Sequence, residues 1–163
     1  MKKKLLAIFL VAFMLICAGC FGDPVKSDLE AYLNFEMSVE QESQDFSLDF
    51  MGNAYGATNK EEVLKIFKDG TEKLTALADK QRSYKPKTKE VQDIHDKGIK
   101  VLDNSVATLN ELTNLMNESN PSKEKLNSIM KGQQDTIKLM KEYRNDINAL
   151  AEQKKVEVKL NFK

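Results

Sequence analysis

Two cysteines stand three positions apart in the stretch "LICAGC", residues 15–20, and a C-x-x-C spacing can serve a redox couple or part of a zinc site. Redox work requires a polar, partly exposed setting that stabilises a thiolate, and zinc requires further cysteine or histidine ligands. Here thirteen consecutive apolar residues, 5–17, include the first cysteine, and the single histidine, His95, stands alone. The spacing therefore predicts neither a redox site nor a metal site.

The setting of the two cysteines indicates export instead. Three lysines precede the apolar run, which as a helix would measure about 20 Å, short of the roughly 30 Å hydrocarbon core of a bilayer. Such a run is typical of a cleaved secretory signal. Ala18 and Gly19 before Cys20 resemble the bacterial lipobox, in which signal peptidase II cleaves before a lipid-modified cysteine. Cys17 departs from that pattern, which usually has Leu there.

The lipobox resemblance implies that residues 1–19 are removed and that Cys20 carries a diacylglyceryl thioether. The protein would then be anchored at the outer face of the cytoplasmic membrane. An ordinary signal peptide that leaves a free cysteine is the alternative.

Carboxylates are the next residues that could do chemistry. Seven acids lie between positions 28 and 49, and Glu36 with Glu40, like Asp45 with Asp49, share a helix face at i,i+4 spacing. They could gather a cation, but calcium sites normally draw on a tight loop that adds backbone carbonyls. The preferred interpretation is an acidic, solvated face whose charges pair with lysines on other helices.

Catalytic sets are missing from the sequence. Di-iron bundles use Glu-x-x-His pairs, whereas Glu90 stands five residues before the single His95, which is expected to flank the core beside Ile94. No Ser-His-Asp set, P-loop or glycine-rich nucleotide turn is found. We expect a protein that is not an enzyme and that needs neither a cofactor nor a metal.

Charge and composition narrow the class further. Removal of residues 1–19 takes away three lysines and no acids, which leaves 22 basic and 25 acidic side chains, a net charge of −3, on 144 residues. That balance argues against nucleic acid as a partner. The absence of Trp and the few prolines and glycines favour helices over strands.

Apolar residues at three- and four-residue spacing predict four amphipathic helices, over about 25–50, 58–81, 88–116 and 126–150. Thr58 with Glu61 forms a capping box for the second, and Thr88 is expected to cap the third. Gly52 and Gly56 are expected to break the first helix. The short connectors favour an all-α, up-down-up-down antiparallel four-helix bundle. The predicted domains are residues 1–19, the signal peptide, 20–23, the lipidated tether, and 24–163, the helical bundle.

Two local features leave alternatives open. The last segment, "KVEVKLNFK", alternates apolar and polar residues, so it is either a continued or frayed helix, which we favour, or a strand that adds to the sheet of a partner. Gly70, within an apolar face, either permits close helix approach or, more simply, costs about 1 kcal/mol of helix propensity.

The predicted topology assigns two surfaces. The second connector and the C-terminus would return toward the membrane, and basic residues that could meet anionic headgroups gather at that connector: Lys80, Arg82, Lys85, Lys87 and Lys89. The first connector would lie far from the membrane, where Gly52, Tyr55 and Gly56 are candidates for partner contact. Plain solvated connectors are the alternative for both.

Two segments, "DPVKSDLEAYLNFEM" and "KPKTKEVQDIHDKGIKVLDN", resemble small helical lipoproteins of Bacillus-type Gram-positive bacteria. The resemblance implies an extracytoplasmic, membrane-anchored helical domain. It transfers no catalytic residue.

Two functions are therefore expected. The first is a non-enzymatic, lipid-anchored bundle that binds another cell-envelope component, protein or polymer. The second is a bundle that holds a small apolar or cationic molecule between its helices, with the lining methionines Met37, Met116, Met130 and Met140, which could equally be plain core residues. An enclosed cavity of a few hundred cubic ångströms would favour the second, and a solid core the first.

Overall fold

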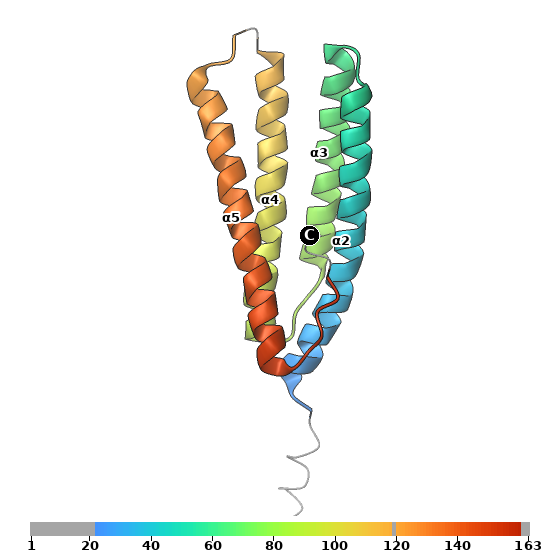
Figure 1. Ribbon diagram of the computed structural model, residues 1–163, viewed down its shortest axis with the longest axis vertical. Coiled ribbons are helices and arrows are strands. Elements are labelled where there is room, and N and C mark those ends of the chain that lie inside the picture. Colours follow the sequence, from blue (N-terminus) through green and yellow to red (C-terminus); the bar gives the residue numbers. More distant parts are fainter. Residues whose placement is uncertain (1–21, 119, 161–163) are drawn as a thin grey trace, which may run out of the picture.

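Four long helices make up this protein in the computed structural model, which describes residues 22–118 and 120–160 (Figure 1). They are α2 (Pro24–Gly56), α3 (Lys60–Ser83), α4 (Lys89–Asn117) and α5 (Lys123–Lys154), and the described chain contains no strand. The helices pack against one another, which confirms the predicted all-α class. Within the described residues, none of the helices is long and apolar enough to cross a membrane. The predicted signal peptide and Cys20 lie outside them.

The two ends of the molecule differ. The start of α2, the α3–α4 connector and the end of α5 lie at the lower end in Figure 1, and the α2–α3 and α4–α5 connectors lie at the upper end. We call the corresponding parts of the molecule the lower half and the upper half.

Capping side chains explain where α2 and α3 begin. Asp23 Oδ1 accepts hydrogen bonds from the backbone N–H groups of Val25 (3.0 Å) and Lys26 (3.2 Å), and Pro24 supplies the fixed φ angle of a first helical residue. At α3, Asn59 caps the N–H of Glu62 at 2.9 Å, and the Glu62 carboxylate accepts from the Thr58 N–H at 2.7 Å. The predicted box of Thr58 with Glu61 is therefore wrong by one residue.

Helix α2 continues past the predicted break. It includes Gly52 and ends only at Gly56, so the α2–α3 connector is just residues 57–59. A glycine inside a helix costs about 1 kcal/mol, and neighbouring turns that form good hydrogen bonds can absorb that cost. The prediction that these glycines interrupt the helix is wrong for Gly52.

The hydrophobic core lies in the lower half. Leu29 and Tyr32 of α2, Val91 of α4 and Ile147 of α5 are completely buried against one another. Burial of such side chains contributes roughly 1.5–3 kcal/mol each, so this cluster is a large source of stability for the fold.

The C-terminal segment completes this core. Helix α5 ends at Lys154, because Lys155 takes a left-handed conformation (φ 54°) and the Val156 N–H bonds back to the Ala151 carbonyl at 2.9 Å. Residues 156–160 then run extended over the lower half (Figure 1), where Val156 and Val158 are half-buried and Leu160 is buried. The favoured continuation of the helix is thus wrong, and the alternation instead turns apolar side chains onto the protein's own core.

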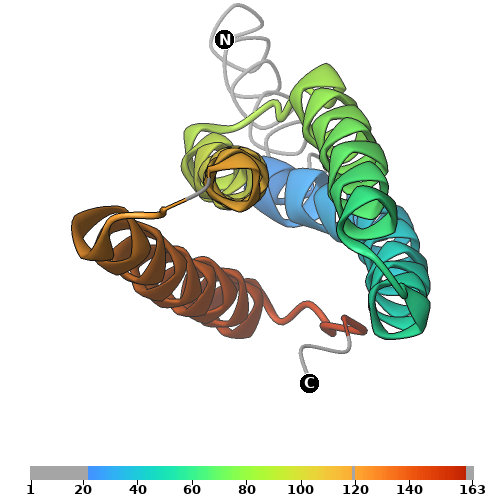
Figure 2. The same ribbon diagram turned by 90° about the horizontal axis from the view of Figure 1, so that it is seen from above.

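Toward the upper end the bundle opens. Seen from above, α5 and α2 diverge from each other, whereas α3 stays beside α2 and α4 beside α5 (Figure 2). Gly70 permits close packing in the α2–α3 pair, because a Cβ there would lie only 2.8 Å from the Phe50 ring. Close approach, rather than a mere propensity cost, is the reason for glycine at this position.

Candidate functional site

The seam between α2 and α5 is open above the C-terminal segment and forms a cleft of about 440 Å³. Helix α4 forms its back wall through Gly98, Val101 and Leu102, and Leu160 closes its lower edge. The remaining lining residues come from the flanking helices and α3: Glu36, Val39, Glu40, Ser43, Gln44, Ser47, Leu48, Gln81, Met140, Tyr143 and Arg144.

A second hollow, of about 380 Å³, continues this cleft toward the upper end. It begins at Ser105 of α4, the turn after Leu102, and its lining is mostly apolar: Phe46, Phe50, Leu74, Leu109, Leu112 and Ile137, with Thr108, Gln133 and Thr136. From Gly98 to Leu112 the two hollows extend along about 21 Å of α4 at 1.5 Å per residue. Both hollows are lined by α2, α3, α4 and α5, and we refer to them together as the α2/α5 groove.

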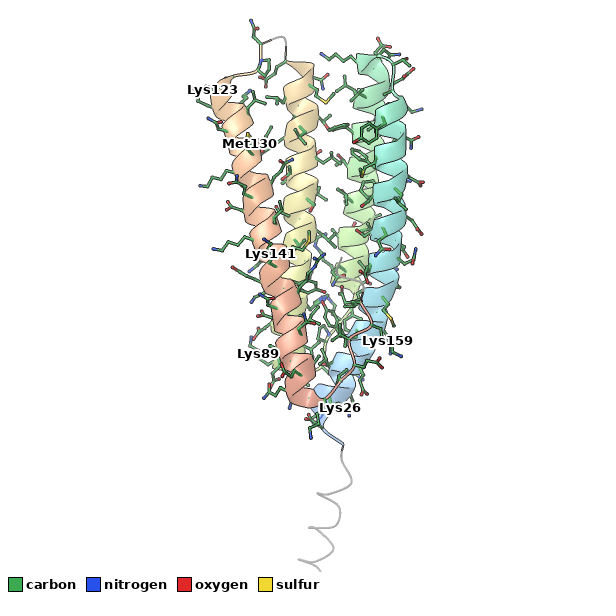
Figure 3. The ribbon with its side chains drawn as sticks, in the orientation of Figure 1. Lys26, Lys89, Lys123, Met130, Lys141 and Lys159 are labelled. Atoms are coloured by element: carbon green, nitrogen blue, oxygen red, sulfur yellow. The ribbon has the colours of Figure 1, made fainter. Side chains whose placement is uncertain are left out.

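Large apolar side chains remain exposed beside the α2/α5 groove. On α2, Leu48, Met51 and Tyr55 follow one another at three- and four-residue spacing, and on α5 Met130 (57 % exposed) and Ile137 (53 %) do the same across two turns. Figure 3 places Met130 in the upper half. Leu126, Met130 and Ile137 belong to the apolar periodicity that predicted the fourth helix, yet they are exposed, because no described helix packs on this side of α5.

A buried polar cluster forms the lower end of the groove. Glu36, only 7 % exposed, accepts a hydrogen bond from the Gln81 side-chain amide, which also donates to the Tyr32 hydroxyl at 3.3 Å. The hydroxyls of Tyr32 and Tyr143 are 2.9 Å apart. Three helices, α2, α3 and α5, thus bring one carboxyl, one amide and two phenols together.

Burial governs the ionisation of this cluster. Desolvation raises the pKa of Glu36 above its ordinary value, although hydrogen bonds from Gln81, Tyr143 and Tyr32 partly oppose the shift. The pKa values of Tyr32 and Tyr143 are raised by burial as well, so both phenols stay protonated and can donate. The sequence analysis missed this cluster, because Glu36 merely interrupted an apolar stripe and was assigned to a solvated acidic face.

His95 also belongs to this cluster. It is 2 % exposed, its ring meets that of Tyr32 edge-on at 5.7 Å between centroids, and its Nδ1 lies 3.4 Å from the Gln81 amide nitrogen. Burial lowers the pKa of His95, which favours the neutral ring. The expectation that His95 flanks the core is therefore corrected to a fully buried position. Gly98, one turn further along α4, gives Gln81 and Tyr143 room, since a Cβ there would lie 3.2 Å from each.

Asp28 is the second acid that departs from the predicted solvated face. Its Oδ2 atom accepts from the N–H groups of Lys87 (2.8 Å) and Thr88 (2.7 Å) and from the Thr88 hydroxyl (2.7 Å). A side chain of α2 therefore holds the two residues directly before α4, whereas Thr88, the predicted cap, lies at the N-cap position but makes no capping bond with its own side chain. Asp28 positions α4, the back wall of the groove.

The predicted basic surface lies at the lower end, where Figure 3 shows Lys89 and Lys26. Several of its charges are engaged within the bundle. Lys80 pairs with Glu42 at 2.5 Å, Arg82 with Asp79 and Asp103, and Lys89 with Asp93. Lys85 Nζ donates to the Arg82 carbonyl at 3.0 Å. The positive charge of this end is thus smaller than the residue count suggests.

The predicted contact residues at the other end are accessible. Tyr55 is 86 % exposed, and open space surrounds both Gly52 and Gly56. They lie on the last turns of α2 rather than in a loop. Tyr55 is therefore held on a helix and continues the apolar stripe beside the groove.

The candidate metal ligands and lining methionines can be placed in the part of the chain that the structure describes. Among the described residues no three His, Cys, Asp or Glu side chains are grouped closely enough to hold a metal ion. Of the four methionines considered as lining, Met140 lies in the groove, Met130 is exposed beside it, and Met37 packs against the core cluster.

Comparison of this chain with protein-family models, with curated proteins and with solved structures finds no match. The fold and the groove by themselves define the molecule as an open helical bundle with a long amphipathic groove.

Proposed function

We propose that this chain is a lipid-anchored extracytoplasmic binding protein, not an enzyme, that holds an elongated, largely apolar ligand in the α2/α5 groove. In this proposal a signal peptide, residues 1–19, is cleaved and a diacylglyceryl group on Cys20 holds an up-down-up-down antiparallel bundle at the outer face of the membrane. Helix α2 begins at Pro24, only four residues after Cys20. The groove would then open on the side of the bundle and extend toward the end farther from the lipid.

One observation carries the ligand-binding proposal: apolar side chains line and border a groove that no part of the described chain covers. Hydrophobic burial is worth about 25 cal/mol per Å², so an uncovered apolar groove lowers stability unless a ligand fills it. The two hollows, about 440 and 380 Å³, each fall within the range of small-molecule sites. The main cluster of buried side chains, which would have argued against a ligand, lies in the lower half, away from the second hollow.

Filling the groove tests this proposal. The full chain in lipid nanodiscs, with ¹³C-labelled methionine methyl groups, is titrated with 1-octanol while the Met140 resonance is followed. We expect a saturable shift, which Val101→Trp abolishes by occupying the cleft. Lys100→Trp, an exposed position on the same helix, leaves the shift intact. If octanol does not move the Met140 resonance of the unchanged chain, the groove does not bind apolar ligands.

The anchor has a separate test. Intact mass of the membrane fraction is expected to show a chain that begins at Cys20 and carries a diacylglyceryl group, and Cys20→Ser is expected to remove it. A membrane-bound product that retains residues 1–19, or a secreted one with a free thiol, contradicts the anchoring.

A second candidate function is supported by the apolar stripe that runs beyond the hollows to the upper end. Met51 and Tyr55 of α2 and Leu126 of α5 are exposed there. Because a bundle seam is normally filled by a helix, the partner in this alternative is an envelope protein that inserts the apolar face of a helix. A photocrosslinker at Tyr55 or at Met130 is expected to trap the same helix, and one at the exposed Lys68 of α3 is not. Crosslinks to unrelated surfaces would rule the alternative out.

A further inference from the structure

The carboxyl group of Glu36 stands at the lower end of an otherwise mostly apolar cleft. The hydrogen bonds that reach it come from uncharged groups, the Gln81 amide and the hydroxyls of Tyr143 and Tyr32. Neutral donors satisfy part of a carboxylate, which offers about four lone-pair sites, but they do not neutralise its charge. A buried carboxylate is stabilised most strongly by a cation at hydrogen-bonding distance.

Each helix around the cleft contributes a polar or charged group near Glu36. Helix α2 contributes Glu40, α3 the neutral Gln81, α4 the neutral His95 behind Gln81, and α5 Tyr143 and Arg144. The charged groups that line the cleft are thus two carboxylates against one guanidinium, a net charge of −1 when Glu36 is ionised. The cleft is complementary to a ligand that carries one positive charge.

A second acceptor lies in the same wall. Gln81, which is 1 % exposed, has a side-chain oxygen that accepts no hydrogen bond from the described residues. A buried acceptor without a donor costs roughly 1–3 kcal/mol. An ammonium group has three N–H donors and no acceptor, so it can serve a carboxylate and an amide oxygen together.

We propose that the α2/α5 groove binds an organic ammonium compound, with its cationic head at Glu36 and Gln81 and its aliphatic or aryl chain along the apolar hollow toward Leu112. This inference rests on the ligand-binding function proposed above and names the chemical class of the ligand. A free metal ion does not fit, because most of the groove is apolar and the described residues offer no group of three metal ligands.

Ionisation of Glu36 is linked to this binding. The neutral acid offers no charge to the ammonium, so affinity is highest where Glu36 is ionised and falls as the pH drops and the carboxylate is protonated. Because burial favours the protonated acid, part of the loss occurs above the ordinary range of a glutamate. A neutral ligand with the same chain lacks this dependence.

The test uses octylammonium as the probe and 1-octanol as its neutral analogue. Both are titrated into the full chain in lipid nanodiscs, with nanodiscs alone as a blank, and the Met140 methyl resonance reports occupancy of the cleft. We expect octylammonium to bind about tenfold more tightly than octanol. Glu36→Gln should remove that difference without changing octanol affinity, whereas Glu61→Gln, at an exposed position on α3, should change neither.

The outcomes separate the two proposals. Equal affinities for both probes, unaffected by Glu36→Gln, overturn the ammonium inference and leave the apolar groove standing. No response to either probe overturns both. Where Glu36→Gln fails to fold, the unchanged chain still decides: the affinity for octylammonium, relative to octanol, must fall severalfold on acidification, and a constant ratio between the two probes refutes the inference.

Discussion

Two buried residues of the polar cluster respond to pH in opposite directions. Burial raises the pKa of Glu36 above the ordinary 4.5, so the folded state binds its proton more tightly than the unfolded state, and stability falls as the pH rises through the raised value. Burial lowers the pKa of His95 below 6.5, so stability falls as the pH drops below that value. The contributions of these two residues to the pH dependence of stability therefore oppose each other, and a variant is needed to separate them.

Glu36→Gln isolates the first of these contributions. The amide keeps an oxygen for the Gln81 donor but never ionises. At pH 8 we therefore expect the free energy of unfolding of the variant to exceed that of the unchanged chain by about 1 kcal/mol or more. The difference should shrink toward pH 4.5, where Glu36 is protonated in the folded state and already half protonated in the unfolded state. Urea unfolding at both pH values measures it, and a difference that does not change with pH would show that Glu36 ionises freely in the folded protein.

At the scale of single elements, the start of α4 depends on a residue of α2. Asp28 accepts two backbone N–H bonds and one hydroxyl bond from Lys87 and Thr88, the two residues directly before α4, so it joins two helices that are far apart in sequence. This contact differs from the caps of α2, α3 and α5, whose capping side chains come directly before the helix in the sequence. Loss of Asp28 therefore loosens a tertiary contact as well as a helix end.

Asp28→Ala is expected to lower the free energy of unfolding by about 2 kcal/mol, since it removes the hydrogen bonds that hold the segment before α4 and leaves part-buried donors without an acceptor. Asp69→Ala is the matched control, because it makes the same change in the middle of α3 at an exposed position. Thermal or urea unfolding compares the two. Equal effects would mean that the Asp28 hydrogen bonds contribute nothing to stability.

The whole molecule is closed in its lower half and open in its upper half. In the lower half, residues 156–160 cover the side of the core that α2 and α5 leave free, and in the upper half the same seam is the α2/α5 groove. Leu160 belongs to both, because it is buried in the core cluster and also borders the cleft. Leu160 therefore marks the boundary between the closed and the open parts of the seam.

Leu160→Ala is expected to destabilise the fold by about 2 kcal/mol, the lower end of the range for a buried leucine. Leu126→Ala, on the open part of α5 where the side chain is 42 % exposed, is expected to cost less than about 0.5 kcal/mol. The two free energies of unfolding, measured by urea denaturation, should differ clearly. Similar values would mean that the C-terminal segment does not pack on the core.

Local sequence signals predicted most of the secondary structure. Apolar periodicity located all four helices, because this signal depends only on a few neighbouring residues. The errors at helix ends are small and have local causes. The cap of α3 moved by one residue, and Gly52 was absorbed into α2 because one glycine costs less than the hydrogen bonds that the helix gains by continuing.

The candidate site was not predictable in this way, since it depends on which faces of distant helices meet. Glu36 looked like a solvated acid until Gln81 of α3 and Tyr143 of α5 were seen to enclose it. Ile137 looked like a core residue until α5 was seen to diverge from α2. The amino-acid sequence by itself determined the helices, because their formation is a matter of local hydrogen bonds and amphipathic spacing. Only the tertiary structure decided which apolar stripes were buried and which line the groove, because burial is a property of the neighbours that a helix acquires in space.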